Sequence, residues 1–62
     1  MNQKGRERLL KAKEIIENEI EIERDKFLNL PESLQYGKPG EALEDIIMWL
    51  EEARDALNEV GV

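Results

Sequence analysis

The apolar residues between positions 42 and 60 recur at intervals of three and four residues. This 3-4-3-4-3 spacing is that of the a and d positions of a heptad, which form the contact stripe of a helix packed along another helix. The pattern therefore predicts a helix over about residues 41–60 with one apolar stripe facing a neighbouring helix. The stripe consists of Leu43, Ile46, Leu50, Ala53, Leu57 and Val60.

Another helix is predicted over about residues 5–29, where strong helix formers follow one another without a proline. At 100° per residue, its larger apolar side chains gather on one stripe, which we expect to form the other half of the contact. Ile15 and Ile22 lie outside this stripe and, being seven residues apart, form a second narrow stripe on the same helix. The residues of the main stripe are Leu9, Ile16, Ile20 and Phe27.

Residues 30–40 interrupt the helical pattern. Pro31 disfavours a helical conformation in the residue before it and allows one short turn after it. Pro39 is tolerated at the start of the next helix, and Gly61 is placed to end that helix. We therefore expect one domain over residues 1–62, an all-α antiparallel hairpin of two helices joined by this linker.

A hairpin of this size does not cover its own apolar surface. A 62-residue chain buries only about 60% of the surface that its unfolded form exposes, and such chains are stabilised by disulfides, metals or self-association. Cysteine is absent, which excludes a disulfide. We expect two hairpins to pair as a homodimer and to form a four-helix bundle. The residues assigned to the dimer interface are Ile15, Ile22, Ile47, Trp49 and Ala56.

The charged residues divide the chain into two unlike halves. Residues 1–31 contain seven basic and seven acidic side chains, whereas residues 32–62 contain two basic and eight acidic ones and carry the whole net charge of −6. An acidic second half disfavours direct binding to nucleic acid. The N-terminus lacks the apolar segment of a signal peptide, and the longest apolar run, residues 46–50, is too short to cross a membrane. The expected location is the cytoplasm, without a membrane partner.

The first helix begins with basic residues and the second ends with acidic ones, opposite to what the helix dipole favours at each end. An antiparallel hairpin brings these two ends together. We therefore expect the basic cluster of residues 4–13 to pair with Asp55 and Glu59 near the end of the second helix.

Two glutamates, Glu19 and Glu23, lie between the two apolar stripes of the first helix. If the surface around them is buried, each must be paired with a cation or be protonated, because an isolated buried carboxylate is costly. We expect a structural ion pair at this place. The candidate cations are Arg8, Lys26 and Arg54.

Catalytic chemistry has little support in this composition. The chain has no histidine, cysteine or threonine, and its single serine, Ser33, has no base to activate it. We therefore expect a protein that is not an enzyme and that needs no metal or cofactor. One alternative stays open, because Glu52-Ala53-Arg54-Asp55 resembles the second acidic element of magnesium-dependent nucleotide pyrophosphohydrolases of the MazG type. The doubled glutamate motif that comes first in that family is absent from the chain.

The turn sequence Asn29-Leu30-Pro31-Glu32-Ser33-Leu34-Gln35 is followed by Gly40-Glu41-Ala42 and then by Glu51-Glu52-Ala53 with Leu57. This order resembles a pattern of short orphan proteins of bacterial viruses and prophages, over roughly residues 7–60. It departs from that pattern at residues 36–39, where small polar residues are usual. The resemblance implies a helical hairpin, a viral or prophage origin and binding to a host or defence protein, and it transfers no site residues.

The functional hypothesis is a small acidic protein-interaction module. Its leading form is a phage-encoded inhibitor that docks on a host defence or nucleic-acid-processing protein in the host cytoplasm and blocks it by occlusion or acidic mimicry. The alternative is a homodimerisation or assembly module whose partner contact is an apolar patch. The residues assigned to partner binding are Glu44, Asp45, Met48, Glu51, Glu52 and Asp55 on the second helix and Tyr36 in the linker.

Overall fold

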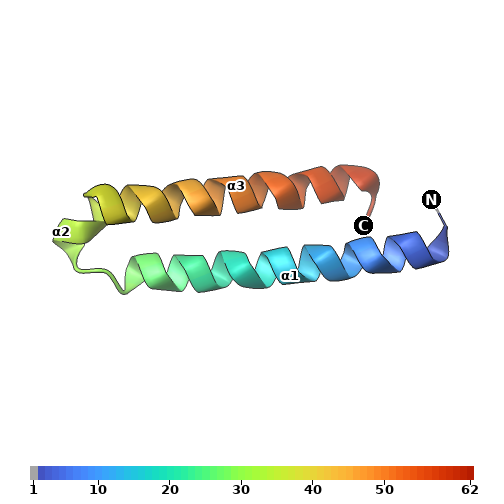
Figure 1. Cartoon of the computed structure of the whole chain (residues 1–62), viewed down its shortest axis with the longest axis horizontal. Coiled ribbons are helices and arrows are strands. Elements are labelled where there is room, and N and C mark those ends of the chain that lie inside the picture. Colours follow the sequence, from blue (N-terminus) through green and yellow to red (C-terminus); the bar gives the residue numbers. More distant parts are fainter. Residues whose placement is uncertain (1) are drawn as a thin grey trace.

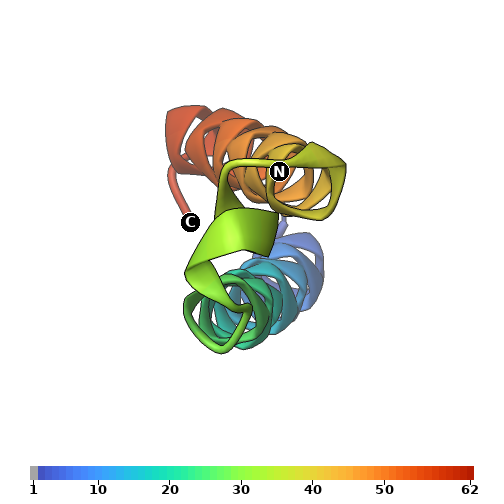
Figure 2. The same ribbon diagram turned by 90° about the vertical axis from the view of Figure 1, so that its left-hand side faces the viewer.

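The computed structural model describes Asn2–Val62 and is built from three helices. The long helices α1 (Gln3–Leu28) and α3 (Lys38–Val60) run antiparallel, and the short helix α2 (Glu32–Gln35) lies in the turn between them (Figure 1). The described residues form no strand, and the predicted all-α helical hairpin is confirmed. The Cα atoms span 48 × 15 × 10 Å, so the molecule is a flat rod two helices wide (Figures 1 and 2).

The helix ends follow from local sequence signals. The side chain of Asn2 accepts a hydrogen bond from the Gly5 amide at 2.8 Å and so caps α1. Gly61 ends α3 in the left-handed conformation with φ of 92°, which glycine adopts without steric cost. Both long helices begin two to three residues earlier than the sequence predicted. In α3 this is possible because Pro39 needs no amide partner in the first helical turn.

The turn is held by Gln35 and closed by Gly40. The Gln35 side-chain amide donates hydrogen bonds to the backbone oxygens of Phe27 at 3.1 Å and Leu30 at 3.2 Å, which satisfies acceptors at the end of α1. Gly40 is buried in the first turn of α3, directly against the backbone of Gln35. An added Cβ on Gly40 would lie 1.9 Å from the Gln35 oxygen, so only glycine fits there.

The two long helices contact each other through one stripe of side chains on each helix. The positions on this interhelical stripe are buried or half-buried, and they repeat at intervals of three and four residues. On α1 they are Leu9, Lys13, Ile16, Ile20, Glu23 and Phe27, and on α3 they are Leu43, Ile47, Leu50, Arg54 and Leu57.

The stripe on α3 differs from the predicted one on one flank. Ile46, Ala53 and Val60 were expected to face α1, but in the single hairpin all three are exposed. Ile47 was assigned to the dimer interface, but it is half-buried against α1. The contact with α1 therefore uses the flank of α3 that carries Ile47 and Arg54.

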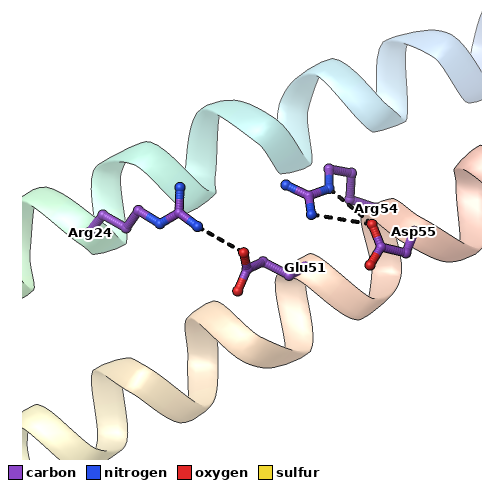
Figure 3. A network of polar contacts seen from close by, with 4 residues as sticks. All are labelled: Arg24, Glu51, Arg54 and Asp55. Carbon is purple, nitrogen blue, oxygen red and sulfur yellow. Dashed lines mark hydrogen bonds and ion pairs between the residues drawn. The ribbon is translucent and has the colours of Figure 1, made fainter.

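Polar contacts explain why α3 turns this flank toward α1. Glu51 lies on the same flank and accepts a hydrogen bond from Arg24 of α1 at 2.7 Å (Figure 3). The Arg54 side chain extends from α3 toward α1 (Figure 3). Its guanidinium forms an ion pair with the neighbouring Asp55 carboxylate, with an N–O distance of 3.2 Å. The aliphatic part of an arginine can cover apolar surface while its charged end reaches solvent. The Arg24–Glu51 ion pair and the long Arg54 side chain thus lie at the contact with α1 in place of the apolar residues Ile46 and Ala53.

The hairpin has almost no core. Ile20, with 3% of its surface exposed, is the only buried hydrophobic side chain of the described residues, and none of their larger side chains is fully buried. The accessible surface is 4750 Å², whereas a compact protein of this mass exposes about 4,100 Å². No helix of the described chain is both long and apolar enough to span a bilayer. A single hairpin therefore leaves much of its apolar surface in water.

Candidate protein-interaction surface

Exposed apolar side chains form a stripe along each long helix. Ile15 is 69% exposed on α1, and Trp49 is 59% exposed on α3. Their neighbours along the two stripes are exposed as well. We name this set the apolar face: Ile15 and Ile22 of α1 with Ile46, Trp49, Ala53, Ala56 and Val60 of α3.

The two stripes of the apolar face lie on the same side of the hairpin. Except for Val60, the residues of the apolar face come one residue before positions of the interhelical stripe, as Ile15 comes before Ile16 and Trp49 before Leu50. One residue back is a rotation of 100° about a helix axis. Because α1 and α3 run in opposite directions, this rotation turns both stripes toward the same side. The two stripes therefore share one side of the hairpin, where α1 also carries Glu19 between its two isoleucines and Lys26 beyond them.

The opposite side of the hairpin is mainly charged. Positions one residue after the interhelical stripe turn to that side by the same argument, and they include Arg24 and Glu51. This ion pair joins the two helices, with side chains 52% and 34% exposed (Figure 3). Its geometry closes that side of the hairpin with a polar cross-link. This side also carries the exposed side chains of Leu10, Leu28 and Met48, but they are set among charged positions, whereas the apolar face has an unbroken apolar stripe on α3.

The positions of the interhelical stripe lie level in pairs such as Phe27 with Leu43, Ile20 with Leu50 and Lys13 with Leu57, and long side chains reach along the hairpin from these levels. Arg24 meets Glu51 at 2.7 Å, and the Lys13 ammonium donates a hydrogen bond to the backbone oxygen of Val62 at 2.9 Å. This register brings Ile22 of α1 nearest the level of Trp49 on α3, and Ile15 nearest the level of Ala56.

A shallow hollow of about 470 Å³ lies on α1 at the outer edge of the apolar face. In the register above it is level with the last two turns of α3. Its lining residues are Lys11, Glu14, Ile15, Asn18 and Glu19. The hollow is open to solvent in the single hairpin and has both apolar and charged walls.

Glu23 provides the structural ion pair that the sequence suggested. Glu23 is only 7% exposed, and its carboxylate accepts a hydrogen bond from the Lys26 ammonium at 3.0 Å. That contact lowers the pKa of the Glu23 carboxyl below its ordinary value of 4.5, burial opposes the shift, and a hydrogen bond with Glu19 adds to it. Of the three candidate cations, the one used is Lys26, one helical turn away on α1.

The basic start of α1 meets the end of α3, but through a different contact from the one predicted. Arg6 donates a hydrogen bond to the backbone oxygen of Gly61 at 3.2 Å, and Lys13 bonds that of Val62. Neither Asp55 nor Glu59 pairs with a basic residue of α1 within Asn2–Val62. Cations near the last carbonyls of a helix interact favourably with its dipole. The basic residues of α1 therefore still stabilise the end of α3, but through its backbone oxygens and not through its carboxylates.

The residues assigned to partner binding divide into two groups. Glu51 is half-buried and bonded to Arg24, so the hairpin itself uses this carboxylate. Tyr36 is 84% exposed at the turn. The others lie exposed along the outer side of α3, which we name the acidic surface: Glu44, Asp45, Met48, Glu52 and Asp55.

The carboxylates of the acidic surface do not converge. In the chain from Asn2 to Val62, no group of three or more acidic side chains is arranged so that it could hold a metal ion. The alternative of a magnesium-dependent hydrolase therefore receives no support from this geometry. Comparison with known proteins adds no assignment, since no family model, curated protein or solved structure matches the chain.

Proposed function

We propose that this chain is a non-catalytic protein-interaction module that works as a homodimer, with the apolar faces of two hairpins packed together in a four-helix bundle. The observation that supports the proposal is the imbalance of burial. Among the described residues one hydrophobic side chain, Ile20, is buried, while the apolar face on one side of the hairpin is exposed. Contiguous apolar surface of this kind marks an interaction site.

The energetics favour a second layer of helices. Most of the stability of a helix in a protein comes from packing of its apolar side rather than from helix propensity. Each large apolar side chain that is removed from water contributes about 1.5–3 kcal/mol. Ile15, Ile22, Ile46 and Trp49 are all still exposed in the single hairpin. Packing two such faces together recovers these contributions on both copies.

The size of the face also fits a second copy. The flat side of the rod is 48 Å long and 15 Å wide between Cα atoms. Its area is comparable with the roughly 800 Å² that each partner buries in an interface of standard size. A face that pairs with itself around a two-fold axis is the commonest way to close an assembly. No further component is needed to cover the apolar face.

The mass of the protein in solution tests the proposal. We expect sedimentation equilibrium at micromolar concentration to give twice the chain mass of 7.2 kDa. We also expect the thermal midpoint to rise with protein concentration, because association stabilises the folded state. A mass of one chain, with a midpoint independent of concentration, would overturn the proposal.

The acidic surface supports a second function, binding to a basic surface of another protein. Within the described residues, the carboxylates of α3 that form ion pairs are Glu51 and Asp55, which leaves Glu44, Asp45 and Glu52 free to meet a partner. This is the surface that an inhibitor of a nucleic-acid-processing or defence protein would present, as the resemblance to phage proteins implies. The dimer would carry two such surfaces, one on each copy.

Salt dependence tests this second function. The immobilised protein is used to capture its partner from a bacterial lysate. We expect this capture to weaken as salt rises from about 0.05 to 0.3 M, because dissolved ions screen the attraction between exposed charges. The variant Glu44→Gln/Asp45→Asn should lose that capture, and Met48→Ala should keep it. Capture that is unchanged by salt and by the double variant would contradict the role of the acidic surface.

A further inference from the structure

We infer that the two copies pair around a two-fold axis parallel to the helices, so that α1 of each copy lies on α3 of the other and both turns are at the same end of the bundle. This inference rests on the homodimer proposed above and specifies which surfaces of the two copies meet. It follows from the placement of charge and side-chain size along the apolar face.

Two arrangements can bring the two apolar faces together. With the two-fold axis along the helices, α1 packs on α3 of the second copy in the register of the hairpin itself. With the axis across the helices, α1 packs on α1 and α3 on α3, and the turns lie at opposite ends. Both arrangements keep neighbouring helices antiparallel, so helix dipoles do not distinguish them. Charge and shape do.

The net charges of the helices favour contact between unlike helices. α1 contains seven basic and seven acidic residues and is neutral, whereas α3 contains two basic and seven acidic residues. Packing α3 on α3 would set two helices of net charge −5 side by side. Packing α3 on α1 separates them to diagonal corners of the bundle, where their repulsion is weaker.

The outer edges of the apolar face are complementary in the same arrangement. Lys11 and Asn18 lie one turn before Ile15 and Ile22, at the outer edge of α1. Glu52 and Glu59 occupy the equivalent edge of α3. When α1 lies on α3 of the second copy, the register brings Lys11 level with Glu59 and Asn18 level with Glu52. In the other arrangement the acidic edges of the two α3 helices face each other.

Side-chain size favours the same pairing. Ile15 of α1 would pack on the small Ala56 of the second copy, and Ile22 would pack between Trp49 and the small Ala53. Large residues set against small ones interdigitate well. The hollow around Ile15, about 470 Å³, would then receive the last two turns of the second copy's α3.

Spin-label distances between the two copies test the arrangement. The chain has no cysteine, so Ser33→Cys introduces a unique labelling site on the exposed surface of α2, at the turn. If both turns are at the same end, we expect a distance below about 30 Å, since neighbouring helix axes in a bundle are 8–10 Å apart. If the turns are at opposite ends, the labels would be separated by about the 48 Å length of the hairpin.

Two further measurements separate the possible outcomes. A label at Glu17→Cys, near the middle of α1, should give a short distance in either arrangement and controls for labelling. Gln3→Cys, at the exposed start of α1 and the end of the hairpin away from the turn, should repeat the short distance of Ser33→Cys. A dimer with long distances at both end positions would overturn the arrangement and leave the homodimer intact. A chain that sediments as a single copy would overturn both proposals.

Discussion

Ala53→Glu is expected to convert the dimer into single hairpins and to lower the thermal midpoint sharply. Ala53 is exposed in the single hairpin, so a glutamate there meets no atom of its own chain and suits a helix. In the dimer the same carboxylate would be buried against the apolar face of the second copy with no cation assigned to it. An uncompensated buried charge costs several kcal/mol or prevents the contact.

The matched control places the same side chain on another side of α3. Met48→Glu adds one glutamate to an exposed position, 45% accessible, that lies on the acidic surface and outside the apolar face. We expect this variant to keep the mass of two chains and a midpoint close to that of the parent. Sedimentation equilibrium and circular dichroism melts at equal protein concentration measure both quantities. If Ala53→Glu keeps the mass and midpoint of the parent, the apolar face is not the contact between copies.

Much of the fold could be predicted because its signals are local. Asn2 supplies a cap, Pro39 suits the first turn of a helix and Gly61 adopts a left-handed conformation, and each acts within a few residues of its own position. Pro31 stops α1 before the turn. Once two amphipathic helices and a short connection are established, an antiparallel hairpin is the ordinary result.

The rotation of α3 could not be predicted from spacing alone. Leu43, Leu50 and Leu57 belong to two heptad patterns, one completed by Ile46 and Ala53 and the other by Ile47 and Arg54. Apolar side chains favoured the first pattern. The structure uses the second for the contact with α1, because long side chains can lie along an interface and keep their charged ends in solvent.

The candidate interaction surface depends on this rotation. Had Ile46, Ala53 and Val60 faced α1, the exposed apolar residues of α3 would have been a scattered set with Trp49 at their edge. Turned toward Ile47, α3 presents an unbroken stripe instead. A pairing of Arg24 with Glu51, twenty-seven residues apart, was not visible in the sequence because both residues sit among many charged neighbours. The same ion pair closes one side of the hairpin and leaves the other side apolar.

Gly40→Ala is expected to be the most damaging single change in the turn, although alanine is the better helix former by about 1 kcal/mol. The added Cβ would lie 1.9 Å from the Gln35 oxygen and 2.5 Å from its carbonyl carbon, and these are backbone atoms that cannot rotate away. To make room, α2 must move off α3, which also breaks the hydrogen bonds from Gln35 to the end of α1. We expect a loss of about 3 kcal/mol or more in the free energy of unfolding, at the upper end of overpacking effects.

Gly37→Ala is the matched control for Gly40→Ala, three residues earlier in the same turn. Its nearest neighbour would be the Ser33 oxygen at 3.5 Å, an ordinary contact, and its backbone at φ −102° and ψ −167° suits any residue. We expect a change within about 0.5 kcal/mol, typical of a surface substitution. Urea unfolding followed by circular dichroism, at one protein concentration because association contributes to stability, measures both variants. If Gly40→Ala unfolds at the same urea concentration as Gly37→Ala, the contact of α2 with α3 does not hold the turn, and the register of the two long helices must depend on the Arg24–Glu51 pair and the interhelical stripe alone.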